Sequence, residues 1–214
     1  MKNLELVQAS GLRPAVQALR RRGIDPTPYL ERNGIPPEFI ELPYAPLPKR
    51  EGLWAFLEDV ESSEGIDTLG FLMGDEVDLL NIGPFGYQIA QAATLRGAFD
   101  VALRNLSNFA QEKTLHLEPD GDEVWVVCKS HLKTCRPADH TTLNFIISVI
   151  RLAAGHDWCP KRARLQTGPA PGVQALPMFR DCEIEFDAEG AGVALPIEML
   201  DLPLATHDPD ALPA

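Results

Sequence analysis

Apolar residues in the first half of the chain recur at steps of three and four, the spacing of one face of a helix. The clearest example follows Thr94, a residue type that accepts a hydrogen bond at a helix start, and continues to about Glu112. Between Gly70 and Gly86 the glycines and Pro84 interrupt this spacing, so we expect a packed segment rich in turns. Shorter helices are predicted over residues 14–22, 26–33 and 49–64.

The spacing of apolar residues changes to two from Thr114 onward, which is typical of a strand with one buried face. Asp120 and Gly121 supply the turn of a hairpin whose second strand is predicted over 123–130. Further elements follow: a buried helix over 138–154, a strand over 162–167, a short helix over 173–179, and a second hairpin pairing 183–186 with 193–196. Short helices followed by a mostly antiparallel sheet packed with helices predict the α+β class.

Charge and composition narrow the possible functions. The 214 residues include 19 Lys and Arg against 31 Asp and Glu, a formal net charge of −12, so this chain alone is not expected to bind DNA or RNA. The acidic Glu5 interrupts any secretory signal, and the most apolar run, 143–150, is far shorter than the roughly 20 residues of a membrane span. Four cysteines form no dense disulfide framework. We therefore expect a cytoplasmic protein with reduced thiols and no membrane contact.

One cluster of residue types has a spacing that could suit a metal ion. Cys128, His131, Cys135 and His140 could converge on one tetrahedral zinc, and Cys135 could act as a nucleophile beside a helix start. The spacing is ragged, however, and Cys128 lies in a predicted strand as a small buried side chain. No nucleophile, phosphate-loop or dinucleotide motif is present. We therefore expect no metal, no cofactor and no enzymatic activity, with a zinc or thiol sensor as an alternative.

Aromatic side chains are the better candidates for a binding site. The segment 83–87 is predicted to form a tight turn just before a helix, which would present two aromatic rings beside free backbone donors. Aromatic residues at helical or strand spacing are more often core residues than ligand contacts. The candidate ligand-binding residues are Phe85, Tyr87, Phe109, Trp125 and Phe145.

Several motifs in order resemble the effector-binding N-terminal domain of AraC-type transcription regulators, in the branch similar to the ornithine and virulence regulators. They are Leu69-Gly70-Phe71-Leu72-Met73-Gly74, Gly83-Pro84-Phe85-Gly86-Tyr87 and Thr94-Leu95-Arg96-Gly97-Ala98-Phe99, with later similar segments at 155–160, 179–186 and 195–204. The resemblance extends from about Pro14 to Leu204. It implies that Gly83, Gly86, Cys182 and Phe186 serve the scaffold and that no residue is catalytic.

The resemblance also implies a division of the chain. Residues 1–204 would form an effector-binding and dimerisation domain, helical over 1–112 and α+β over 113–204, and 205–214 would be a linker toward an absent helix-turn-helix domain. A small organic effector would bind between the N-terminal helices and the sheet, a homodimer would form, and DNA would be contacted only through the missing domain. The alternative from a different class is a dimerisation module that binds no small molecule.

Overall fold

The computed structural model describes residues 6–42, 45–77, 79, 83–110 and 112–208, which fall into two compact units. The first unit comprises residues 1–76 and 135–141, and the second comprises 77–134 and 142–214. Helix α7, Arg136–Ala154, begins in the first unit and continues in the second.

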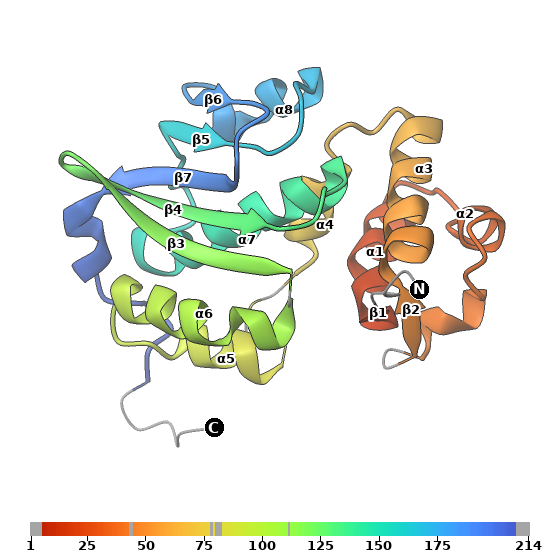
Figure 1. Cartoon of the computed structure of the whole chain (residues 1–214), viewed down its shortest axis with the longest axis horizontal. Helices are drawn as coiled ribbons and strands as arrows, with labels where there is room; N and C mark the ends of the chain where they lie inside the picture. The colour runs from red at the N-terminus through yellow and green to blue at the C-terminus, as the bar shows by residue number, and fades with distance from the viewer. Residues whose placement is uncertain (1–5, 43–44, 78, 80–82, 111, 209–214) are drawn as a thin grey trace. The chain divides into compact units, whose positions relative to one another are not determined.

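The first unit consists mainly of short helices, as the sequence predicts (Figure 1). Its elements are β1 Leu6–Gln8, α1 Arg13–Arg21, α2 Thr27–Arg32, β2 Pro46–Pro48, α3 Ala55–Glu64 and α4 Leu69–Asp75. Strands β1 and β2 pair in an antiparallel manner. The sequence does not predict this pair because both strands have only three residues and two of the three in β2 are prolines. A π-helical turn over Lys49–Trp54 precedes α3, and Gly65 ends α3 in the left-handed conformation.

Helix α4 corrects the prediction of a turn-rich segment between Gly70 and Gly86. Gly70 lies inside α4, where an added Cβ would be 2.1 Å from the carbonyl oxygen of Pro137 and 2.6 Å from the Cβ of His140. The glycine therefore permits close contact with the first turn of α7 instead of breaking the helix. The hydroxyl of Thr141 lies within hydrogen-bond distance of the carbonyl of Pro137 in its own helix, at 2.8 Å, and of the carbonyl of Gly70 in α4, at 3.1 Å.

The second unit contains a five-stranded sheet in the order β3-β4-β7-β5-β6 (Figure 1). Its elements are α5 Pro84–Ala90, α6 Leu95–Phe109, β3 Lys113–Asp120, β4 Glu123–Ser130, most of α7, β5 Arg162–Arg164, α8 Pro171–Ala175, β6 Glu183–Glu185 and β7 Ala191–Pro196. All strand pairs are antiparallel except β5 with β6. The α+β prediction is confirmed.

The local signals at α6 and at the first hairpin are also confirmed. The hydroxyl oxygen of Thr94 accepts a hydrogen bond from the Gly97 amide at 3.2 Å, and Gly121 adopts a φ of +63° between β3 and β4. Helix α6 ends at Phe109 instead of continuing to about Glu112. The strand predicted over 162–167 is limited to β5, and the helix predicted over 173–179 is divided into α8 and a 3₁₀ turn over Pro177–Phe179.

The predicted second hairpin is wrong. Strand β6 pairs in parallel with β5, and β7 pairs with both β4 and β5, so β5 separates the two predicted partners. Residues 191–195 are all buried, which fits a central strand with a neighbour on each side, whereas Glu183 and Glu185 on β6 are exposed at the sheet edge.

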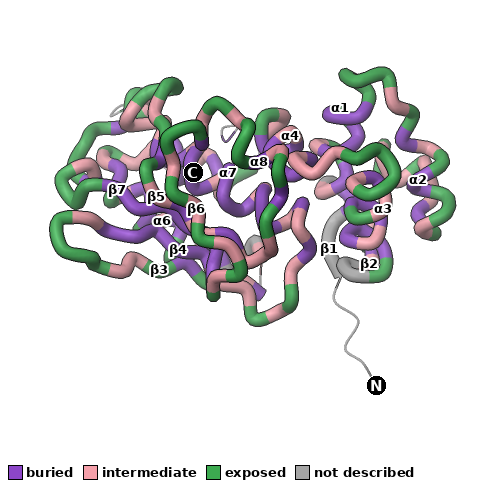
Figure 2. The backbone as a smooth tube through the Cα atoms, turned by 90° about the horizontal axis from the view of Figure 1, so that it is seen from above, coloured by how far each residue is buried: buried purple, intermediate pink, exposed green. Residues whose placement is uncertain are grey.

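The main core of the second unit lies on one face of the sheet, and a small buried cluster of Trp125, Val127 and Ala194 lies on the other. Leu115, Val126, Val193 and Ala163 point to the face with the main core and are buried, and helix α6 packs against β3. Figure 2 shows α7 as a largely buried helix, in agreement with the burial of Leu143, which is one of several such residues along it. None of the helices in the described residues has the length and apolar character needed to cross a bilayer.

Candidate functional site

The opposite face of the sheet carries charged side chains. Alternation along β4 places Trp125, Val127 and Lys129 on this face, and strand pairing sets Glu118 opposite Trp125. We call this surface the charged face, and it consists of Glu118, Asp120, Glu123, Trp125, Val127, Lys129, Arg162, Arg164, Glu183, Glu185, Gly192 and Ala194.

Trp125 lies at the centre of the charged face beneath two arginines. The guanidinium carbons of Arg162 and Arg164 are 4.9 and 3.9 Å from the centroid of its ring. Both arginines belong to β5 and reach across β7, where Gly192 and Ala194 present almost no side chain in between. Only 4% of Trp125 is exposed, so its ring is covered by cations and is not an open platform for a ligand.

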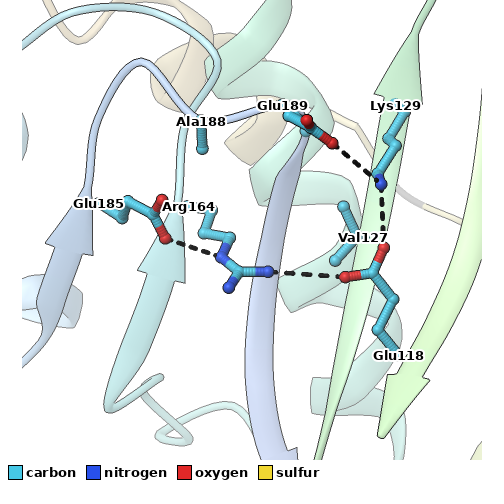
Figure 3. Close-up of a pocket in the computed structure, with 8 residues that line it drawn as sticks. Glu118, Val127, Lys129, Arg164, Glu185, Ala188 and Glu189 are labelled. Atoms are coloured by element: carbon cyan, nitrogen blue, oxygen red, sulfur yellow. Dashed lines mark hydrogen bonds and ion pairs between the residues drawn. The ribbon is translucent and has the colours of Figure 1, made fainter. Parts of the chain in front are cut away.

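Arg164, one of the two arginines over Trp125, is also part of a chain of alternating charges (Figure 3). Lys129 bridges Glu189 at 3.5 Å and Glu118 at 3.1 Å, and Arg164 bridges Glu118 at 3.6 Å and Glu185 at 2.9 Å. The hydrogen bond to Glu118 is the main cause that raises the pKa of Lys129, with the nearby charge of Glu189 adding to it. The side chains of these residues are partly or fully exposed to water, which screens their charges, so the ion pairs are individually weak.

The charge chain surrounds a hollow of about 300 Å³. Val127 and Ala188 supply its few apolar atoms, and Gly190 forms part of its wall. A Cβ at Gly190 would lie 2.6 Å from Cγ1 of Val127 and 2.9 Å from Cγ of Lys129, so only glycine lets the segment after β6 approach the sheet so closely. The arrangement offers carboxylates, an ammonium group and a guanidinium group around one small cavity, and the lining residues include no serine, threonine or cysteine.

The structure brings two of the five predicted aromatic residues together. The rings of Phe85 on α5 and Phe145 on α7 stack with centroids 6.1 Å apart and planes 8° apart. Tyr87 is half-buried on the same helix as Phe85. Phe85 and Tyr87 lie within α5 and not in a turn before a helix, because Gly83, with a φ of +85°, forms the turn and Pro84 begins the helix. Trp125 makes its ring contacts with the arginines, and the side chain of Phe109 lies outside the described part of the structure.

The cysteine and histidine cluster is divided between the two units, and the surroundings of Cys135 do not favour a thiolate. Cys128 is buried on β4 and His131 is exposed in the second unit, whereas Cys135 and His140 are buried in the first. Burial raises the pKa of Cys135 to about 12, the opposite of what a thiolate nucleophile requires. Across the described ranges, no three His, Cys, Asp or Glu side chains are arranged to hold a metal ion.

His140 has an unusual environment for an imidazole. Its ring stacks on Phe71 with centroids 4.7 Å apart, and neither ring nitrogen has a hydrogen-bond partner among the described residues. Burial, and next the positive charge of Arg136, lowers the pKa of His140 from 6.5 to about 3. The histidine is therefore a neutral core residue.

The residues around the hollow were missed by the sequence reasoning, which concentrated on aromatic side chains. The sequence pattern that marks these residues is a pair of charged residues two positions apart in a short strand. Examples are Arg162 with Arg164 and Glu183 with Glu185. That spacing marks a solvated strand face but does not show which strands are neighbours.

A comparison with protein families adds to this geometry. Residues 23–204 match the model of the arabinose-binding domain of AraC transcription regulators, N-terminal part. The chain belongs to this family. The resemblance noted from the motifs is thereby confirmed, and it covers both units of this AraC-type domain.

A solved structure supports the same fold. The AraC-type domain is similar to the crystal structure of the transcriptional regulator CdpR from Pseudomonas aeruginosa, with a TM-score of 0.63 and 20% sequence identity. The match covers 93% of this chain and 58% of the CdpR chain. The comparison of this chain with curated proteins gave no match.

Proposed function

We propose that this chain is the regulatory, effector-binding part of an AraC-type transcription regulator, and that its effector binds in the hollow on the charged face. The observation that carries the regulatory role is the family match over residues 23–204. Binding would shift an equilibrium between two states of the regulator, to the extent that the effector contacts one state better than the other. Homodimerisation, and DNA contact through a separate domain, belong to the same proposal.

The geometry favours a small polar effector. Carboxylates of Glu118, Glu185 and Glu189 and the cations of Lys129 and Arg164 dominate the lining, while apolar contact is limited. A fatty or purely aromatic molecule would leave these groups without compensation for lost water. Because the existing ion pairs are exposed and weak, an effector with hydrogen-bonding or charged groups can replace them at small cost.

A thermal-shift panel tests the proposal. The polar arm contains amino acids, sugars, di- and tricarboxylates and diamines, and the apolar arm contains decanoate and benzoate. A ligand present at a hundred times its Kd adds about 2.7 kcal/mol, which raises Tm by about 5 °C or more for a chain of this length. We expect at least one polar compound to do so and the apolar arm to have no effect.

A matched pair of variants locates the binding site. Arg164→Met removes a guanidinium from the hollow, and Arg96→Met removes one from an exposed ion pair with Asp201 on another surface. The apparent affinity for the polar compound, obtained from the Tm shift at several concentrations, should fall at least tenfold in R164M. In R96M it should stay within twofold of the value for the unaltered protein. Equal responses of the two variants would place the site elsewhere, and a panel with no response at all would favour a dimerisation module without a ligand.

The stacked pair Phe85 and Phe145 supports a second candidate site within the same function. Both rings and the neighbouring Tyr87 are only half-buried, so they could contact an apolar effector. A response of the apolar arm that Phe85→Ala abolishes and R164M leaves intact would favour this second site over the hollow.

A further inference from the structure

Two of the four cysteines lie at the same end of a pair of parallel strands. Strands β5 and β6 pair with Arg162 opposite Glu183, and the amide of Glu183 donates to the carbonyl of Lys161 at 2.9 Å. Cys182 directly precedes β6, and Cys159 lies two residues before Lys161. The strand register therefore brings both cysteines to the beginning of the same two strands.

These two thiols differ from the other two in accessibility. Cys159 is exposed and Cys182 is half-exposed, whereas Cys128 and Cys135 are buried. The thiol of Cys159 donates to the carbonyl of Asp157 at 3.4 Å, and the thiol of Cys182 donates to the carbonyl of its neighbour Glu183 at 3.6 Å. Both contacts are weak and local, so neither thiol is tied to a distant part of the fold.

The two thiols are also near enough for a charge on one to affect the pKa of the other. Burial raises the pKa of Cys182 to about 11, and the nearby Cys159 is the second cause of this increase. Cys182 is therefore protonated at neutral pH and is poorly suited to attack an oxidant first. The more exposed Cys159 is the better first target.

We propose that Cys159 and Cys182 are a thiol-oxidation site that forms an intramolecular disulfide in the presence of a peroxide. The Cys159 thiolate attacks one peroxide oxygen, which breaks the O–O bond and releases water from hydrogen peroxide after proton uptake, leaving a sulfenic acid. The sulfur of Cys182 then attacks the sulfenic sulfur, its proton leaves with the hydroxyl group as a second water, and the S–S bond forms. In total, two thiols and one hydrogen peroxide give one disulfide and two waters.

The disulfide would restrain β5 and β6, the two strands at the edge of the sheet that contribute Arg164 and Glu185 to the hollow. It closes the segment 160–181, which includes β5 and α8, and it holds the beginning of β6. Arg164 on β5 and Glu185 on β6 line the hollow, so oxidation supplies a redox input beside the proposed effector site. Reversible bonds of this kind are the form in which disulfides occur in reducing compartments.

The experiment uses the full chain and hydrogen peroxide. After reduction and removal of the reductant, the protein is treated with a slight molar excess of peroxide, denatured, alkylated with N-ethylmaleimide, and analysed by intact mass and peptide mapping. We expect two alkylated cysteines instead of four, a cross-linked pair of peptides containing Cys159 and Cys182, and complete reversal by dithiothreitol. Cys182→Ser should abolish the cross-link, and the matched control Cys128→Ala should retain it.

Each other outcome contradicts the proposal. Four alkylated cysteines after peroxide treatment would show that no disulfide forms, and a cross-link that includes Cys128 or Cys135 would assign the chemistry to other thiols. A disulfide between two chains through Cys159 alone would show that Cys182 is out of reach. Circular dichroism of each variant before oxidation establishes that the comparison is made between folded proteins.

Discussion

The buried His140 makes the stability of the first unit depend on pH. Its pKa is lowered from 6.5 to about 3 in the folded protein, so the unfolded chain takes up a proton first as the pH falls. The stability associated with the neutral ring is complete above pH 6.5 and is lost progressively between pH 6.5 and pH 3. From pH 7.5 to pH 5.0 the loss due to this one residue is about 2 kcal/mol.

Urea unfolding at pH 7.5 and pH 5.0 measures this loss. His140→Phe keeps an aromatic ring against Phe71 and removes the titrating group, so its free energy of unfolding should fall by about 2 kcal/mol less than that of the unaltered protein over this pH range. His116→Gln, at an exposed position, is the control and should behave like the unaltered protein. The reasoning is refuted if His140→Phe loses the same free energy as the control, or if NMR shows the His140 ring titrating near pH 6.5.

Further substitutions test the packing and capping of the helices. Gly70→Ala should destabilise the protein by about 2–4 kcal/mol in urea unfolding, because the new Cβ would lie 2.1 Å from the carbonyl oxygen of Pro137. Gly97→Ala is its matched control in α6, where the nearest atom is 3.5 Å away, and it should be neutral or stabilising by up to about 1 kcal/mol; equal losses would show that Gly70 is not required for close packing. Thr94→Ala removes the cap of α6 and should lower the free energy of unfolding by about 1 kcal/mol, whereas no change would show that the cap contributes nothing.

The sequence contained good signals for elements that are local and regular. Thr94 and the spacing behind it predicted α6, and the alternation around Asp120 and Gly121 predicted the first hairpin, since the partners in both cases are close in the chain. Gly70 was misjudged because its reason lies in contact with Pro137, far away in the sequence. A glycine required by packing and a glycine that ends a helix look alike in a single sequence.

The prediction of the second hairpin was wrong for a related reason. Residues 183–186 and 193–196 are close in sequence and separated by glycines, so direct pairing was the simplest expectation. The three-residue strand β5 lies between them and is too short to show a pattern that specifies its neighbours. The pairing of β6 and β7 with β5 therefore could not be predicted from local sequence patterns and is seen only in the folded sheet.

The candidate site was less predictable than the fold. The hollow combines residues from β3, β4, β5, β6 and the segment before β7, and their proximity follows from the strand order. Aromatic residues were reasonable candidates, yet Trp125 is covered by Arg162 and Arg164, which reach it across Gly192 and Ala194. The small side chains of β7 allow the arginines of β5 to reach across it and cover the tryptophan of β4. This arrangement is visible only in the three-dimensional structure.

NMR mapping of a bound effector onto the chain shows whether the effector occupies the hollow on the charged face. The compound with the largest Tm shift in the polar arm of the panel is titrated into the ¹⁵N-labelled protein, and changes in backbone amide shifts are recorded. We expect the largest changes at Glu118, Lys129, Arg164 and residues 185–190, around the hollow on the charged face. Changes concentrated instead on α5 and around Phe145, or saturating binding that leaves the amides of the charged face unchanged, would contradict this expectation.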